Sequence, residues 1–240
     1  MFVDLNCDMG ELEDASVEER IMPHITSANV ACGAHAGSDE IMLRTVRLAE
    51  RFGVAIGAHP GYPDRAHFGR IEIAMTGEEI AATVHQQILR LERTGAKLAH
   101  VKPHGALYNV AAKNAEVAEA IAEGVGRWNR GVALVGLANS RALDVWRKRG
   151  FPVAAEAFAD RRYEPDGTLR SRQYPDALIT DPAEAAAQAV RLVQAGGAQT
   201  LCIHGDSPGA AQTIVAVAAA LRAAGITPRP LASAPRPRSS

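Results

Sequence analysis

The stretch HVKPHGALYN, residues 100–109, places three ionisable side chains at a spacing that lets them act together. His100, Lys102 and His104 are two residues apart, and side chains two apart on a strand point to the same side of it. An imidazole can transfer protons near neutral pH, and an ammonium group can stabilise negative charge that develops during a reaction. Pro103 favours an extended backbone at Lys102. We therefore expect a strand to end here and to carry these side chains into a reactive site.

The N-terminal stretch DLNCDMGE, residues 4–11, shows the same alternation. Asp4, Asn6 and Asp8 would share one face of a strand, with apolar side chains or cysteine on the other face. Three polar groups on an interior face are unfavourable unless they bind one another, a ligand or water. A functional cluster satisfies that condition. An exposed edge strand with its polar face in water is the alternative that the sequence leaves open.

Polar residues recur where further apolar runs end, in ANVACGAHAG, IGAHPGYPD, EAFADRRY and CIHGDSPG. All six stretches together supply carboxylates, imidazoles and cations. These are Asp4, Asp8, Glu156, Asp160, Asp206, His35, His59, His104, His204, Lys102, Arg161 and Arg162. A carboxylate with two histidines can hold a divalent metal that activates water. A carboxylate base, a histidine acid and a charge-stabilising lysine can instead catalyse hydrolysis without a metal, and the residue types fit both.

The elements that must position these groups alternate along the chain. Apolar periodicity and caps predict helices over 38–53, 76–95, 114–127, 139–149, 181–197 and 207–225. Between the helices lie eight short apolar runs, at 1–7, 27–32, 54–58, 97–102, 131–137, 151–158, 176–180 and 200–204. Strands alternating with helices predict an α/β fold, an irregular (β/α) barrel of about seven strands, with an open doubly wound sheet as the alternative. In such a barrel the polar strand ends meet at one mouth.

Composition limits the partners and the location. The chain has 240 residues with 26 basic and 27 acidic side chains, so no general basic field attracts nucleic acid or a membrane surface. We expect a small-molecule substrate. The sequence shows no signal-type segment and no long apolar run, which predicts a cytoplasmic protein. We expect one domain over 1–226, a loose Pro/Arg/Ser-rich tail over 227–240 and three reduced cysteines. The phosphate-binding patterns GxGxxG and GxxxxGK[ST] are absent.

The six stretches resemble the LamB/YcsF family, and they follow one another in the family order. The matching motifs are DLNCDMGE (4–11), NVACGAHAG (29–37), GAHPGYPD with FGR (57–70), VKPHGALYN (101–109), EAFADRRY (156–163) and IHGD (203–206). The resemblance implies a barrel similar to that of the polysaccharide deacetylases. It also implies the ATP-dependent opening of 5-oxoproline to L-glutamate by 5-oxoprolinase, in which the family supplies one subunit and works with two others, B and C. ATP, with Mg, is the expected cofactor, and no tightly bound metal is expected.

The resemblance also suggests roles for the residues. The expected catalytic residues are Lys102 for anionic oxygen, Asp8 or Glu156 as base toward water, and His59 or His104 as acid toward the ring nitrogen. The residues expected to contact substrate or phosphate are Asn6, Asn29, His35, Arg70, Asp160, Arg161, Arg162, His204 and Asp206.

Two alternative functions stay open, and the sequence departs from the family pattern at two positions. The first alternative is a metal-dependent amide or ester hydrolase with Asp8, His35 and His59 as ligands. The second is a non-catalytic subunit that binds 5-oxoproline for its partners. Ser38 stands where the family usually has aspartate, and Ile71 where it often has a second arginine. The first departure puts a carboxylate role there in doubt, and the second removes one phosphate contact.

Overall fold

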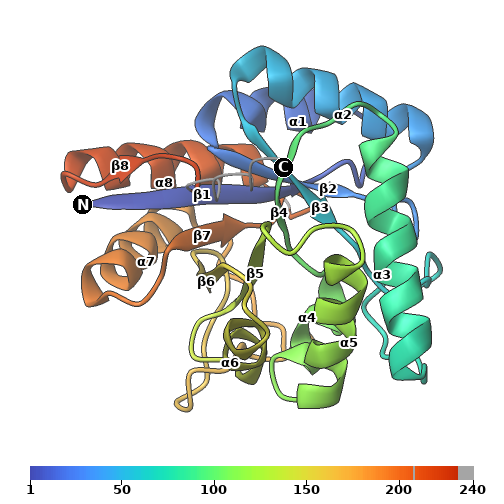
Figure 1. The fold of residues 1–240 in the computed structure, drawn as a ribbon. Helices are drawn as coiled ribbons and strands as arrows, with labels where there is room; N and C mark the ends of the chain where they lie inside the picture. Colours follow the sequence, from blue (N-terminus) through green and yellow to red (C-terminus); the bar gives the residue numbers. More distant parts are fainter. Residues whose placement is uncertain (208, 232–240) are drawn as a thin grey trace.

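In the computed structural model, which describes residues 1–207 and 209–231, seven parallel strands close into a barrel (Figure 1). The strands are β1 (Phe2–Met9), β2 (Ser27–Ala31), β3 (Ala55–His59), β4 (Leu98–Val101), β5 (Ala133–Leu137), β6 (Val153–Phe158) and β7 (Thr200–Ile203). They pair in chain order from β2 to β7, and β1 pairs with both β7 and β2. That double pairing closes the ring, so the barrel prediction is confirmed and the open sheet is excluded.

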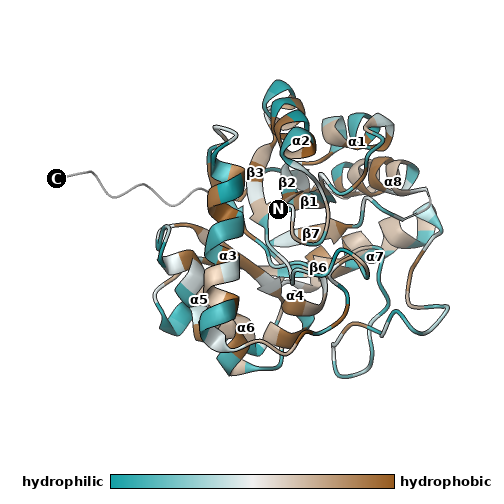
Figure 2. Ribbon diagram, turned by 90° about the vertical axis from the view of Figure 1, so that its right-hand side faces the viewer, coloured by the Kyte–Doolittle hydropathy of each residue, from teal (hydrophilic) through white to brown (hydrophobic). Residues whose placement is uncertain are grey.

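Helices surround the strands, as Figure 1 shows. They are α1 (Ser16–Ile21), α2 (Asp39–Phe52), α3 (Gly77–Glu92), α4 (Gly105–Ala111), α5 (Ala115–Gly126), α6 (Arg141–Lys148), α7 (Pro182–Ala195) and α8 (Ala210–Ala223), with a 3₁₀ turn η1 (Met22–His24). In Figure 2 they carry both hydrophilic and hydrophobic residues, as helices with one face on a core do. The six helices expected from periodicity are present. Within the described ranges, no helix has both the length and the apolar character needed to cross a bilayer.

The interior of the barrel is polar on several of its strands. On β1 the apolar side chains of Val3 and Leu5 belong to the hydrophobic core. Asp4, Asn6 and Asp8 are buried too, and they bond to the side chains of Thr200 on β7, Glu156 on β6 and Lys102 directly after β4. Barrel interiors are usually filled by branched apolar residues. The alternation in the sequence therefore marks a polar interior and excludes an exposed edge strand.

One expected strand is absent from the barrel. The run 176–180 lies in the segment between β6 and α7, where Leu178 forms a single antiparallel bridge with Arg161. Ala177 and Ile179 are buried, so the apolar pattern reflects a loop packed on the core. An apolar run of five residues does not distinguish these two cases.

The chain remains ordered beyond the expected domain boundary at residue 226. Thr227 and Pro228 form a two-residue strand, β8, that pairs with Phe2 and Val3 of β1. The loose tail was expected to begin at 227, so its first two residues instead extend the sheet. Residues 232–240 of that tail lie outside the described residues.

Candidate active site

A buried lysine, Lys102, is the centre of the polar interior. Its Nζ lies 2.9 Å from Oδ1 of Asp8 and 2.9 Å from Oε1 of Glu156. It also lies 3.2 Å from Oδ1 of Asn6 and 3.0 Å from Sγ of Cys202. Lys102 is 2% exposed and Glu156 is fully buried. An ammonium group has three protons, so these four acceptors engage its whole hydrogen-bonding capacity.

Two asparagine side chains connect the carboxylates around the lysine. The Nδ2 group of Asn29 donates to Oδ1 of Asn6 at 2.7 Å and to Oδ1 of Asp8 at 2.8 Å. The Nδ2 group of Asn6 donates to Oε1 of Glu156 at 2.9 Å. His100 Nε2 donates to Oδ1 of Asn29 at 2.7 Å, because an amide oxygen can only accept. Each amide is thereby held in one orientation, and the carboxylates are held toward Lys102.

The network continues to the bottom of the barrel at Asp4. Thr200 accepts from Asn6 at 2.6 Å and donates to Oδ2 of Asp4 at 2.6 Å. The hydroxyls of Thr26 and Ser27 donate to Oδ1 of Asp4 at 2.6 and 2.7 Å. Burial raises the pKa of Asp4 above its ordinary value, although the three hydroxyls lower it in part. The network thus joins polar residues of β1, β2 and β7.

Charge pairing fixes the protonation of the central groups. Burial opposes ionisation of Asp8, but the facing His59 and Lys102 outweigh it and hold the pKa of Asp8 well below its usual range. Burial also opposes the charge of Lys102, and Asp8, Cys202 and Glu156 more than offset it, so the Lys102 pKa is well above its ordinary value. Burial raises the pKa of Cys202 despite the lysine. At neutral pH the site therefore holds an ammonium ion, a carboxylate and a thiol.

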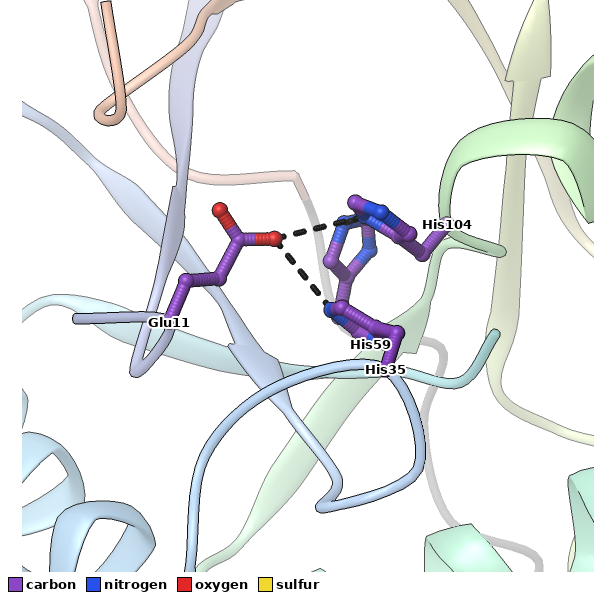
Figure 3. Close-up of side chains that lie close together, drawn as sticks. All are labelled: Glu11, His35, His59 and His104. Atoms are coloured by element: carbon purple, nitrogen blue, oxygen red, sulfur yellow. Dashed lines mark hydrogen bonds and ion pairs between the residues drawn. The ribbon is translucent and has the colours of Figure 1, made fainter. Parts of the chain in front are cut away.

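Beside this network, four side chains form a second group, which we call the histidine cluster: Glu11, His35, His59 and His104 (Figure 3). Glu11 follows β1, His35 lies in the loop after β2, His59 ends β3, and His104 directly precedes α4. The rings of His35 and His104 stack in parallel with their centroids 3.7 Å apart. Glu11 Oε1 lies 3.2 Å from His35 Nε2 and 3.3 Å from His104 Nδ1.

Burial keeps three of these side chains uncharged. It lowers the pKa of His35 and His104 well below the ordinary value, and neighbouring histidines lower it further. Burial raises the pKa of Glu11 well above its usual range, with Asp8 and Asp206 adding to the effect. Neutral imidazoles have a nitrogen lone pair available for a proton or a metal ion.

A further histidine, His204, is held by Asp160. His204 Nδ1 lies 3.0 Å from Oδ2 of Asp160, and the His204 backbone N–H donates to the same oxygen at 2.8 Å. The His204 ring stacks on Phe158, with centroids 5.5 Å apart. Burial opposes ionisation of Asp160, but His204 outweighs it and lowers the pKa of Asp160. The carboxylate thus fixes the orientation of the His204 ring.

These groups meet at a cavity of about 1000 Å³, the size of a small-molecule site. Asp8, His59, Lys102, His104 and His204 all contribute to its wall. Among the described residues its lining includes seven lysine or arginine side chains, Arg70, Lys102, Lys113, Arg141, Arg161, Arg170 and Arg172. It includes three acidic side chains, Asp8, Glu72 and Glu116. This excess of positive charge favours an anionic ligand.

Most residues expected from the sequence lie at this site, in two layers. Those lining the cavity are Asp8, Arg70, His59, Lys102, His104, Arg161 and His204. Those buried behind it are Asn6, Asn29, His35, Glu156 and Asp160. Asp206 is outside the lining and pairs with Arg70.

Arg162, expected to contact substrate or phosphate, lies outside the cavity lining. Its Nη1 lies 2.8 Å from Oε1 of Glu184 on α7. Arg161 and Arg162 are adjacent in an extended segment, where consecutive side chains point to opposite sides. Arg161 faces the cavity, and Arg162 therefore faces away.

The structure groups the three residues suggested as metal ligands, Asp8, His35 and His59, differently. His35 and His59 lie together as expected, but the carboxylate next to His35 is that of Glu11. Asp8 Oδ2 is 3.4 Å from His59 Nε2 and is paired mainly with Lys102. Sequence reasoning missed Glu11 because Gly10, at φ 73°, interrupts the alternation that identified Asp8. Its position at the end of DLNCDMGE was the available signal.

The two departures from the family pattern lie away from the reactive groups. Ser38 caps α2, where its Oγ accepts from the Ile41 backbone N–H at 3.2 Å. Asp39 beside it forms an exposed pair with Arg90. Ile71 is 49% exposed. Ser38 therefore has a structural role at the start of α2.

Comparisons with known proteins agree with the family suggested by the motifs. A sequence model described as the LamB/YcsF family matches residues 3–236. A protein of Chloroflexus aggregans, named as the A subunit of 5-oxoprolinase, is 49% identical over 95% of this chain and 98% of its own. The lactam utilization protein of Thermus thermophilus has a TM-score of 0.88 and 44% identity, covering 96% of this chain and 100% of its own. A family 4 carbohydrate esterase of Streptomyces lividans, at a TM-score of 0.55 and 12% identity over 97% and 93% of the two chains, shares the fold alone.

Replacing Lys102 by methionine should destabilise the fold, because Asp8 and Glu156 would be left buried without their cation. We expect Lys102→Met to lower the free energy of unfolding by about 3–5 kcal/mol. Adding Asp8→Asn and Glu156→Gln should restore part of that loss. Urea denaturation followed by circular dichroism measures both effects. The exposed Lys113→Met is the matched control, and equal losses in the two lysine variants would contradict this role of Lys102.

Gly57 on β3 should not tolerate a side chain. A Cβ there would lie 2.1 Å from Nε2 of His100, the atom that bonds to Asn29. We expect Gly57→Ala to cost about 1–3 kcal/mol through overpacking and to lower the melting temperature. Gly77→Ala is the control, because its Cβ would meet only Ala120 at 3.8 Å. An unchanged melting temperature for Gly57→Ala would show that His100 is not held in this position.

Proposed function

Because the chain belongs to the LamB/YcsF family, we propose that it is one subunit of an ATP-dependent 5-oxoprolinase and that its cavity hydrolyses 5-oxoproline to L-glutamate. The single observation that carries the proposal is the Lys102–Asp8–Glu156 group beside a cavity whose charged lining residues are mainly cations. 5-Oxoproline is an anion, since it has a free carboxylate beside its lactam ring. The names of the similar proteins, which refer to 5-oxoprolinase and to lactam utilization, support the same substrate.

The reaction needs chemical activation because a five-membered lactam is a poor electrophile. In the proposed sequence, the γ-phosphoryl group of ATP transfers to the lactam oxygen and ADP leaves. Water then adds to the lactam carbonyl carbon, and the ring C–N bond breaks as a proton goes to nitrogen. A second water releases phosphate from the resulting acyl phosphate. The products are glutamate, ADP and phosphate, so the site must bind phosphate, activate water and protonate nitrogen.

Asp8 suits the role of base toward water better than Glu156. Asp8 lines the cavity and its pKa is held well below the usual range, so it is ionised. Glu156 is fully buried behind it. The Lys102 ammonium group stabilises the Asp8 carboxylate, and its charge in the cavity wall favours anionic oxygen on the substrate.

His204 suits the role of acid toward the ring nitrogen better than His59 or His104. Its ring lines the cavity, and the carboxylate of Asp160 lies 3.0 Å from its Nδ1 atom. A carboxylate that orients an imidazole in this way is a common arrangement in acid and base catalysis. In His59 and His104, by contrast, one nitrogen is bonded to a backbone carbonyl and the other faces the second imidazole.

The basic residues of the cavity lining are the proposed binding groups for ATP, together with Mg. Arg161 is 5% exposed, and burial lowers its pKa to about 10, so it remains charged at neutral pH. Arg70 lies with its guanidinium 4.8 Å from the centroid of Phe68 and pairs with Asp206. A planar guanidinium group can bind two phosphate oxygens at once through two parallel N–H donors.

We also propose that activity requires two partner proteins, the B and C subunits of 5-oxoprolinase. The similar proteins are named as one lettered component of that enzyme, which supports this requirement. The test is glutamate formation from 5-oxoproline and ATP by this chain alone, by the two partners alone, and by all three together. Glutamate from the complete mixture alone supports the proposal. No glutamate from the complete mixture would show that the proposed substrate is wrong.

Within the complete mixture, Lys102→Ala should reduce the rate of glutamate formation about 10²–10³-fold, because a preorganised charge-stabilising group is lost. Asp8→Asn should cause a loss of the same order. Arg127→Ala, which removes a surface pair with Glu78, is the matched control and should act at the wild-type rate. Circular dichroism establishes that each variant is folded. A near-normal rate for folded Lys102→Ala would remove this lysine from the mechanism.

A further inference from the structure

The histidine cluster has two ring nitrogen atoms that face each other, while the other nitrogen of each ring bonds to a backbone carbonyl. His59 Nδ1 lies 2.7 Å from the backbone oxygen of Lys102, and His104 Nε2 lies 2.8 Å from the backbone oxygen of Phe68. A carbonyl oxygen only accepts, so these two nitrogens carry the ring protons. When both rings are in their neutral form, His59 Nε2 and His104 Nδ1 have lone pairs that face each other at 2.9 Å. Two lone pairs at this distance repel each other unless a cation or an added proton lies between them.

The backbone around Phe68 is shaped to hold this arrangement. Phe68 has a φ of 57°, a left-handed conformation that is unfavourable for a bulky residue. Its carbonyl oxygen is the one that accepts from His104. Gly69, at φ 65°, has no space for a side chain, because a Cβ would lie 2.8 Å from that of His35. The loop after β3 therefore packs directly on the cluster and sets the tautomer of one ring.

Glu11 and His35 direct two further ligand atoms to the same place. Glu11 Oε1 is 3.2 Å from His35 Nε2 and 3.3 Å from His104 Nδ1. One nitrogen or oxygen atom from each of the four side chains lies within 4.8 Å of the other three. Figure 3 shows all four side chains pointing toward one small space from different loops and strand ends. Their side chains are at most 6% exposed.

Three of the separations between these atoms are close to those in a tetrahedral metal site. Bonds of about 2.0–2.1 Å to a central ion place the ligand atoms of a tetrahedron about 3.3 Å apart. The separations between His59 and His104, Glu11 and His35, and Glu11 and His104 are 2.9, 3.2 and 3.3 Å. The other ring nitrogen of His59 and of His104 forms a hydrogen bond to a backbone carbonyl. Hydrogen bonds of this kind orient histidine ligands in metal sites.

We propose that Glu11, His35, His59 and His104 bind a divalent transition-metal ion. Three imidazoles and one carboxylate are the ligand set that suits Zn²⁺ and related ions rather than Mg²⁺ or Ca²⁺. His59 and His104 also line the cavity, so the ion would lie at its edge, next to Asp8. When bound there, such an ion supplies a positive charge that polarises oxygen atoms of a substrate or water. The proposal holds whether or not the substrate is 5-oxoproline.

The test uses the isolated full-length chain and requires no reaction. The protein is stripped with chelator, incubated with Zn²⁺ or Co²⁺, freed of excess ion and analysed for metal by mass spectrometry. We expect about one ion per chain, a visible spectrum of tetrahedral Co²⁺ and a higher melting temperature with the ion. Glu11→Gln and His104→Asn should each weaken binding at least about tenfold. His24→Ala, which alters a histidine outside the cluster, should bind like wild type.

The same measurements can overturn the proposal. Wild-type protein that retains no ion would show that a shared proton, and not a metal, lies between the two imidazoles. Equal binding by wild type, Glu11→Gln and His104→Asn would place the ion elsewhere. A sulfur-to-cobalt charge-transfer band would assign it to the other possible group, Asp8, Cys202 and His204. Because wild-type stoichiometry is measured first, a variant that fails to fold leaves the result decisive.

Discussion

The rest of the structure depends on a lysine ammonium group that is buried inside the barrel and paired with Asp8 and Glu156. A buried charge is stable only when opposite charges and hydrogen bonds replace water. Lys102 therefore requires acidic and amide side chains on the inward faces of β1, β2 and β6. The apolar core that usually fills such a barrel lies instead mainly between strands and helices. This constraint accounts for the polar alternation seen in the sequence.

Much of the fold and site could be predicted from the sequence because the signals were local. Alternation on β1 identified Asp4, Asn6 and Asp8 as one face, and apolar periodicity located the main helices. The number of alternating strand and helix segments predicted a barrel. Other features depend on three-dimensional contacts that short patterns do not encode. The run 176–180 packs as a loop, and the turn at Gly10 brings Glu11 to histidines from three other segments.

The site combines two chemically different regions that border one cavity. Around Lys102 the groups are charged, and their protonation is fixed by ion pairing. In the histidine cluster burial keeps His35 and His104 neutral, and backbone carbonyls orient the rings of His59 and His104. Asp8 joins the two regions, since its two oxygens face Lys102 and His59. Substrate held beside Asp8 would therefore contact both an ionic region and a region of metal-binding ligand types.

The most direct test of the central claim is a crystal structure of the chain with 5-oxoproline. We predict electron density for the lactam ring in the cavity, between Asp8 and His204, with its carboxylate near the arginine side chains of the lining. A lactam bound outside this cavity, or a saturated crystal with only solvent beside Asp8, would contradict the claim that the barrel interior is the site of the reaction.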